Sequence, residues 1–139
     1  MTLQTTVEQA QGRVPVTIAT LVGELDASSY EGVIETVRGI YDAGSRHLLL
    51  DLTGLSFIAS SGLVALHSSL RLMRGEVPPD PEYGWAALRA IGDDVDIGTV
   101  QSNLQLCGTQ EAVQKVLDRT GLGGLIPSHP DRASAIAAF

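Results

Sequence analysis

The stretch LLLDLTGLSFIASSGLVAL, Leu48–Leu66, contains two different periodicities and decides the fold. The run RHLLLDL, residues 46–52, is apolar without alternation, which is typical of a central strand covered on both faces. TGLSFIA is then expected to carry the chain along the carboxyl edge of the sheet. From Ser61 onward apolar residues recur every three or four positions, which predicts a helix that ends at Gly75. Ser60 and Ser61 therefore stand where a strand passes into a helix.

The segments before this stretch predict a hairpin followed by a helix. TLQTTVE, residues 2–8, is expected to form an edge strand, and the turn QGR joins it to a second strand, VPVTIATLVGEL, residues 14–25. DASSYEGVIETVRGIYDAG then repeats its apolar residues at helical spacing. Ser28 followed by Glu31 is typical of a capping box at the start of this helix, and Gly44 is expected to end it.

The second half of the chain predicts further units of strand and helix. SNLQLCG, residues 102–108, reads as a strand, and TQEAVQKVLDRTG as a helix. LGGLIPS, residues 122–128, reads as a short strand or extended piece, and residues 129–139 as a terminal helix. Residues 75–101 hold three of the six prolines and are predicted to be an inserted loop with a short helix around 85–91. Alternating strands and helices predict an α/β fold with a mostly parallel sheet.

Composition limits the size of the protein and the partners that it accepts. A chain of 139 residues with 44% hydrophobic and 18% charged residues is expected to form one globular domain. The formal charge of −7 argues against nucleic acid and anionic membranes, which require clustered Lys and Arg. Cys107 is the single cysteine, and no apolar segment approaches the length of a membrane helix. We therefore expect a soluble, cytoplasmic protein whose partners are other proteins.

Enzyme motifs and metal sites find little support in the sequence. The chain has no nucleophile elbow, no phosphate-binding loop and no dinucleotide fingerprint, and we predict no cofactor. A triad of Ser61, His67 and Asp51 is conceivable, but His67 follows Ser61 on the same helix, about 9 Å further along its axis. His47, His67 and His129 belong to three different elements and lack the spacing of metal ligands.

Ser60 and Ser61 have two readings that the residues alone leave open. Serine is a preferred N-cap, so a purely structural role explains one of them. The second reading is a modification site, because a phosphate at a helix N-terminus is stabilised by free N–H groups and by the helix dipole. Phosphorylation would add about −1.5 to −2 charges at one point on the surface.

Three stretches of the chain resemble the STAS family, the fold of the anti-sigma factor antagonists. VGELDASSY is similar to the family's GELD turn, and Leu48–Leu66 is similar to its strand followed by D-S-S-G-L. LQLCGTQEAVQKVLDRTGL resembles a later strand–helix portion. The resemblance implies a single domain over residues 1–139 with a mixed sheet of four or five strands and about four helices. It also implies a binding module and not an enzyme.

The resemblance further implies a bacterial partner-switching mechanism that regulates transcription. The unphosphorylated antagonist binds an anti-sigma factor with serine kinase activity, and the kinase then phosphorylates the serine before the glycine, which is Ser61 here. A homodimer is a further expectation. The residues implied at the partner surface are Asp26, Ser28, Ala59, Ser60, Ser61, Gly62, Leu63 and Val64.

Two departures from the family pattern leave alternatives open. Ala59 replaces the aspartate of D-S-S-G, so the module either is phosphorylated with altered partner choice or binds its partner constitutively. The loss of that aspartate also suits a STAS-like regulatory subunit of a membrane transporter, either an ABC system or an anion carrier. The insert carries Tyr83 and Trp85, which either contact a partner or fold back over the sheet edge. A module that senses a nucleotide or a lipid is the remaining alternative.

Overall fold

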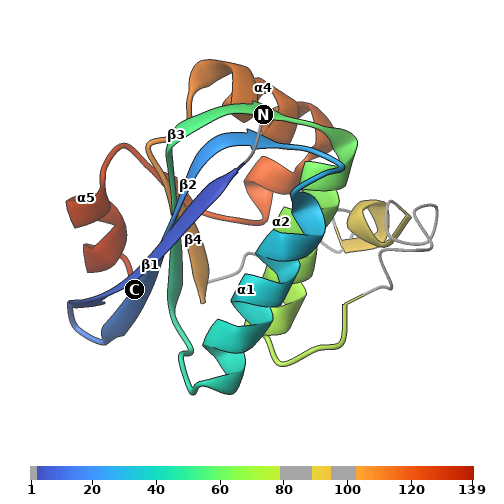
Figure 1. Cartoon of the computed structure of the whole chain (residues 1–139). Coiled ribbons are helices and arrows are strands. Elements are labelled where there is room, and N and C mark those ends of the chain that lie inside the picture. The colour runs from blue at the N-terminus through green and yellow to red at the C-terminus, as the bar shows by residue number, and fades with distance from the viewer. Residues whose placement is uncertain (1–2, 79–88, 95–102) are drawn as a thin grey trace.

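Five strands form one mixed sheet in which only the first pair is antiparallel (Figure 1). The computed structural model describes residues 3–78, 89–94 and 103–139. The strands follow one another across the sheet in chain order, and the expected mostly parallel α/β fold is confirmed. They are β1 (Gln4–Gln11), β2 (Pro15–Leu25), β3 (Leu48–Ile58), β4 (Leu104–Cys107) and β5 (Ser128–His129).

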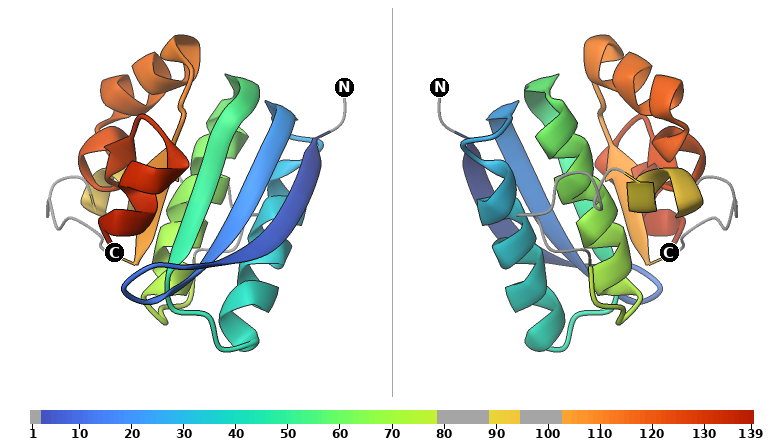
Figure 2. Two further views of the ribbon diagram at one scale, coloured as in Figure 1. Left: turned by 90° about the vertical axis from the view of Figure 1, so that its left-hand side faces the viewer. Right: turned by 90° about the vertical axis from the view of Figure 1, so that its right-hand side faces the viewer.

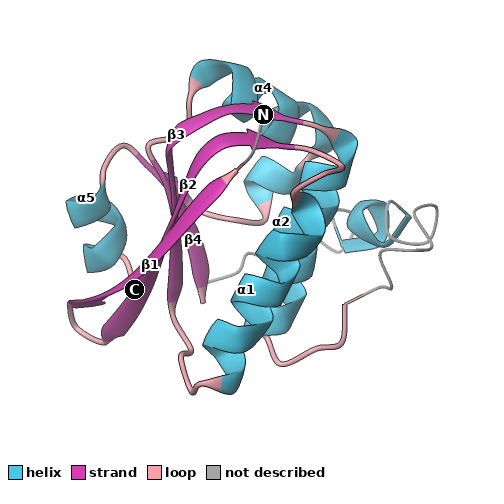
Figure 3. Cartoon of the chain, viewed as in Figure 1, coloured by secondary structure: helices cyan, strands magenta, loops and turns pink. Residues whose placement is uncertain are grey.

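The helices cover the two faces of the sheet unequally. The cluster of buried residues on one face takes side chains from α1, α2 and α4, whereas a smaller cluster on the other face takes them from α5 (Figures 2 and 3). The outer face of β1 is left largely uncovered, whereas α5 covers Val16 and Ile18 of β2 (Figure 2). The helices are α1 (Tyr30–Asp42), α2 (Ser60–Met73), α4 (Glu111–Thr120) and α5 (Arg132–Ala137), with a 3-10 turn η1 (Leu122–Gly124).

The first strand of the hairpin is longer than the sequence predicted. β1 pairs with β2 from Gln4 opposite Val22 to Gln11 opposite Pro15, so the strand continues past the expected end at residue 8. Alternate residues of β2 serve the two faces of the sheet. Leu21 packs beneath α1 and α2, whereas Ile18 faces α5. This double burial explains why β2 places apolar residues on both faces of the sheet.

β3 corrects the prediction that the chain leaves the sheet after residue 52. The strand runs on to Ile58 because β2 extends beside it as far as Leu25. Two register shifts between β2 and β3, one of them between Gly23 and Glu24, each place one extra residue on β3. The segment TGLSF is rich in small and polar residues and looked like a loop, but pairing with the neighbouring strand overrides that local preference.

The sequence predicted some of the helix boundaries and missed others. Gly44 adopts φ +108° directly after α1, and the next N–H donates to the carbonyl of Ile40, so the predicted glycine end is confirmed. The terminal helix starts at Arg132, later than expected, because the carboxylate of Asp131 accepts the N–H of Ser134 at 2.8 Å. The piece expected as a strand over residues 122–128 divides into η1 and β5.

The inserted segment is anchored to α2 through its described part. Residues 89–94 are helical, and the side chain of Ile91 joins the main core. Asp94 accepts hydrogen bonds from His67 and from Arg71, the latter at 3.2 Å. His67 is only 1% exposed, so this pair lies within the protein. The part of the expected helix around residues 85–91 that the structure describes, residues 89–91, is helical, whereas Tyr83 and Trp85 lie outside the described residues.

The buried His67 predicts an acid-sensitive attachment of this segment. Burial lowers the pKa of His67 more than the Asp94 carboxylate raises it. The folded state therefore binds its proton at lower pH than the unfolded state, whose histidine titrates near the ordinary value of 6.5. The stability that neutral His67 contributes is present above that value and is lost as pH falls below it. We expect a smaller loss of unfolding free energy between pH 7.5 and 5.5 in His67→Gln, measured by urea denaturation. An equal loss in both proteins would contradict this role.

Candidate functional site

The ends of β2 and β3 bring two turns of the chain together on one rim of the sheet. Leu25 and Ile58 are paired at the last position of the two parallel strands. The N–H of Ala59 donates to the carbonyl of Leu25 at 2.9 Å. The turn that begins with Asp26 therefore lies beside the segment that begins with Ala59. This is the edge at which parallel sheets gather functional residues.

The Asp26 turn is held by its own side chains. Oδ1 of Asp26 accepts the backbone N–H of Ser28 at 2.9 Å and its hydroxyl at 2.6 Å. The hydrogen bond from the Ser28 hydroxyl is the largest cause that lowers the pKa of Asp26, so this exposed carboxylate is ionised at neutral pH. The expected capping box is wrong: Ser29 is the N-cap of α1 and makes no side-chain cap, while the Ser28 hydroxyl is directed to Asp26.

Neither serine of the SSG segment caps α2. The N-cap is Ala59, whose methyl group accepts no hydrogen bond, and Ser60 and Ser61 are the first two residues of the helix. This corrects the reading of one serine as a cap. Ser60 is exposed and Ser61 is partly buried. Neither hydroxyl makes a hydrogen bond to any residue that the structure describes. The hydroxyl of Ser61 is thus free of hydrogen bonds to the described residues, on a residue that is partly buried.

The alanine at the N-cap is a measurable defect of the helix. Its backbone has φ −92° and ψ 176°, the extended geometry of a normal N-cap, and the first turn of α2 contains no acidic residue. Ala59→Asp supplies a carboxylate that accepts a free N–H of the first turn and faces the positive end of the helix dipole. We expect an increase of about 1 kcal/mol in the free energy of unfolding, measured by denaturant titration. Ala27→Asp, an exposed change in the neighbouring turn, is the control. A gain no larger than that of the control would refute the capping argument.

Gly62, Leu63 and Val64 are buried, although they were expected at the partner surface. A Cβ on Gly62 would lie 2.6 Å from Cγ1 of Ile58 and 2.8 Å from the carbonyl oxygen of Leu25. Glycine is therefore required so that α2 can begin directly over the ends of the two strands. The side chains of Leu63 and Val64 belong to the main core. In this conformation all three residues position the rim and offer it almost no side-chain surface.

Sequence reasoning missed an exposed aromatic residue on the same rim. Phe57 is 49% exposed and pairs in register with Glu24, next to the last residues of both strands. Val22, 44% exposed, is the other large apolar side chain that the end of β2 leaves open. The apolar run LSFI gave no sign of this, because the strand had been expected to end before Phe57. Only the extended pairing of β3 shows that this side chain points away from the core.

Asp51 and His67 have partners that exclude the conceivable triad with Ser61. Nε of Arg132 donates to Oδ2 of Asp51 at 2.6 Å, and Thr53 donates to its Oδ1. His67 is bound to Asp94. These two pairs belong to different parts of the fold, and neither includes the Ser61 hydroxyl.

Cys107 and the potential metal ligands are the remaining side chains that could have a chemical role. Cys107 is buried, and burial raises its pKa to about 11, which leaves the thiol unreactive at neutral pH. Within residues 3–78, 89–94 and 103–139, no group of three potential ligands is arranged to hold a metal ion. In the same ranges no helix has the length and hydropathy needed to cross a membrane.

The fold and the rim define an α/β domain in which a helix start and the ends of two parallel strands meet at one edge of the sheet. A family model described as the STAS domain matches residues 7–76. The chain belongs to the STAS family. The match ends where the inserted segment was predicted to begin. No curated protein matched the sequence.

Solved structures show the same fold at low sequence identity. An anti-sigma factor antagonist from Mycobacterium paratuberculosis is 18% identical with a TM-score of 0.69, over 99% of this chain and 93% of that one. The Bacillus cell fate determinant SpoIIAA in its phosphorylated form is 17% identical with a TM-score of 0.56, over 96% of each chain. SpoIIAA in its unphosphorylated form is 18% identical with a TM-score of 0.51, over 93% of this chain and 89% of that one. At these identities the likeness establishes the fold.

Proposed function

We propose that this protein is an interaction switch, an anti-sigma factor antagonist that binds an anti-sigma factor with serine kinase activity and is controlled by phosphorylation of Ser61. The observation that carries the proposal is the position of Ser61 at the start of α2. The Ser61 hydroxyl makes no hydrogen bond to any residue that the structure describes. Solved antagonists of the same fold, one of them in a phosphorylated form, support it. In this proposal the protein has no catalytic activity of its own and works in the bacterial cytoplasm.

The electrostatics of the rim explain how one phosphate would act as a switch. The N–H groups of the first turn of α2 and its dipole favour a phosphate on Ser61. Modification adds about −1.5 to −2 charges beside the ionised Asp26 turn. A partner that binds the unmodified rim would have to bury this added charge in the interface. Removing the charge from water costs free energy, so binding becomes weaker. Phosphorylation is therefore expected to release the partner.

Phe57 is the proposed anchor of the docking surface. Aromatic residues that fill a partner's pocket contribute much of the energy of protein interfaces. Phe57 is half-exposed and lies on the strand that leads into Ala59 and Ser60, and Asp26 and Ser28 follow the paired strand. Together these five residues form the rim surface that we propose for the partner.

Pull-down from the host followed by an intact-mass measurement tests the proposal. We expect the wild-type protein to recover an ATP-binding kinase, and incubation with that kinase and ATP to add about 80 Da to the chain, the mass of one phosphate. Ser61→Ala removes the acceptor hydroxyl, so it should remain unmodified. Ser60→Ala is the matched control and should still gain the phosphate. Modification of Ser61→Ala would assign the acceptor elsewhere, and recovery of unrelated proteins alone would overturn the antagonist function.

The contribution of Phe57 is measured with the same partner. Phe57→Ala is expected to weaken binding by at least about tenfold, because the anchor side chain is lost. Val77→Ala, at an 86% exposed valine after α2, should bind as the wild type does. Equal affinity of the wild type, Phe57→Ala and Val77→Ala would show that Phe57 is not part of the interface. The proposed function would then depend on the phosphorylation experiment alone.

Ala59 favours one further candidate function, a regulatory subunit of a membrane transporter. The alanine leaves the first turn of α2 uncapped, which weakens the resemblance to a kinase substrate. In this case the wild type should recover a permease or its ATPase, and the mass should not change with ATP. The gene neighbourhood separates the two cases in the same way, since either kinase and sigma factor genes or permease genes are expected beside it.

A further inference from the structure

The free edge of β1 lacks the features that normally protect an edge strand. β1 forms one border of the sheet (Figure 2). Seven of its eight residues are exposed. It contains no proline and no lysine, and alternate N–H and C=O groups of such a strand point away from the sheet. Its only charged side chain, Glu8, is paired with Nη1 of Arg132 at 2.7 Å. The edge is thus long, extended and nearly neutral.

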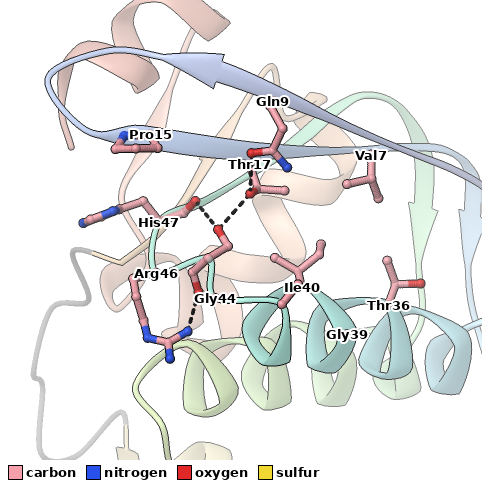
Figure 4. A pocket seen from close by; sticks show the side chains of 12 residues that line it. Val7, Gln9, Pro15, Thr17, Thr36, Gly39, Ile40, Gly44, Arg46 and His47 are labelled. Carbon is pink, nitrogen blue, oxygen red and sulfur yellow. Dashed lines mark hydrogen bonds between the residues drawn. The ribbon is translucent and has the colours of Figure 1, made fainter.

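A groove follows this edge where β1 faces α1. One hollow of 710 Å³ is lined by Val7, Gln9, Thr36, Gly39 and Ile40, among others (Figure 4). A second hollow of 400 Å³ continues past Thr36 toward the start of α1. A Cβ on Gly39 would meet nothing within 4 Å. A helix-interior glycine costs stability, about 0.5–1 kcal/mol relative to alanine, and packing within the chain does not require it here.

We propose that a second copy of this chain covers this edge, with β1 of each copy pairing antiparallel about a two-fold axis. Electrostatics favour a second copy at this place. A chain of charge −7 repels its own copy, and this repulsion is smallest where the surface is neutral. Glu8, the one carboxylate on the strand, already has a cation beside it. The two sheets would join into one of ten strands, and the rim with Ser61 would stay outside the contact.

The exposed Val7 fixes the register of this pairing. It is 46% exposed and lies near the middle of β1, on the side that lines the groove. Placing the two-fold axis at Val7 sets this valine against its own copy and Thr6 against Glu8. Like charges are then not directly opposed. The grooves of the two copies meet across the axis, where the small flank of α1 at Gly39 leaves room for the neighbouring chain.

A cysteine at position 7 tests the register directly. Opposed residues of antiparallel strands have Cα atoms about 4.5–5.5 Å apart, within the range of a disulfide. Val7→Cys is expected to form a covalent dimer when oxidised with diamide, whereas Val77→Cys, at an exposed loop position, is not. The native Cys107 is buried and does not compete. Failure of Val7→Cys to cross-link more than Val77→Cys would overturn the proposed register.

Sedimentation measures the association independently. The wild type is expected to shift from 14.6 kDa toward twice that mass as its concentration rises from about 10 µM to about 1 mM. Val7→Lys should raise the dimer dissociation constant by at least about tenfold, because two ammonium groups would face each other. Gly39→Gln adds a side chain to the flank, and its Cβ meets nothing within 4 Å, so the variant should fold at least as well and also dissociate. A wild type that stays at 14.6 kDa, or a dimer that neither variant weakens, would overturn the proposal.

Discussion

Gly62→Ala is expected to lower the free energy of unfolding by about 2 kcal/mol, the middle of the range for overpacked cores. The added methyl group would lie 2.6 Å from Cγ1 of Ile58 and 2.8 Å from the backbone oxygen of Leu25. A side chain can rotate away, but the carbonyl belongs to the paired end of β2 and cannot move without disturbing the sheet. The start of α2 must shift instead.

The shift would displace Ser61, so the variant also tests how the rim is positioned. Denaturant unfolding gives the stability change, and affinity for the recovered partner gives the functional one. Gly32→Ala is the matched control, because a Cβ there meets nothing within 4 Å. It should be neutral or stabilise the helix by up to about 0.5 kcal/mol. A Gly62→Ala protein as stable as this control would contradict the close approach of α2 to the strand ends.

Arg132→Ala is expected to cost about 2 kcal/mol and to loosen α5. Its guanidinium donates to Oδ2 of Asp51 at 2.6 Å, to Glu8 at 2.7 Å and to the hydroxyl of Thr20 at 2.8 Å, and so ties α5 to three strands. Asp51 is only 6% exposed and would lose its cation. Breaking a buried pair costs about 3–5 kcal/mol, and the 40% exposure of the Arg132 side chain reduces that value.

The pH dependence of the Arg132→Ala effect identifies its cause. Burial opposes ionisation of Asp51, but hydrogen bonds from Thr53 and Arg132 outweigh it and lower its pKa. The contribution of the ion pair is therefore present above the ordinary carboxylate pKa of 3.8 and is lost as pH falls below it. The difference between wild type and variant should shrink in acid.

Asp51→Asn combined with Arg132→Gln is the control that removes both charges. It should cost less than the two single changes added together, because neither group is left unpaired. Additive costs, or a pH-independent loss in Arg132→Ala, would show that the arginine acts through packing alone.

The order of elements could be predicted because local patterns agreed with the tertiary contacts. The helical spacing in residues 26–44, the glycine at its end and the apolar run before Asp51 each reflect burial that the finished fold provides. The rim could be predicted for the same reason, since the carboxyl ends of parallel strands meet at one edge. Family resemblance then singled out Ser61 among several surface serines.

Side-chain partners could not be predicted in this way. Ser28 was expected to cap α1 but binds Asp26, and a serine was expected to cap α2 where Ala59 stands. Asp94 belongs to the segment that was expected to be an inserted loop, yet it contacts the buried His67. Each of these contacts depends on the position of an element distant in sequence or on a shift of one residue at a helix boundary. Periodicity is insensitive to both.

The sequence by itself determined the alternation of strands and helices, the glycine that follows α1 and the place of Ser61 at the start of a helix. These features depend on interactions between residues that are close in sequence. Only the tertiary structure decided that β3 continues to Ile58, that Phe57 is exposed and that Gly62 leaves no space for a methyl group. These depend on how far β2 extends beside β3 and on how closely α2 crosses their ends, and packing between distant segments sets those distances.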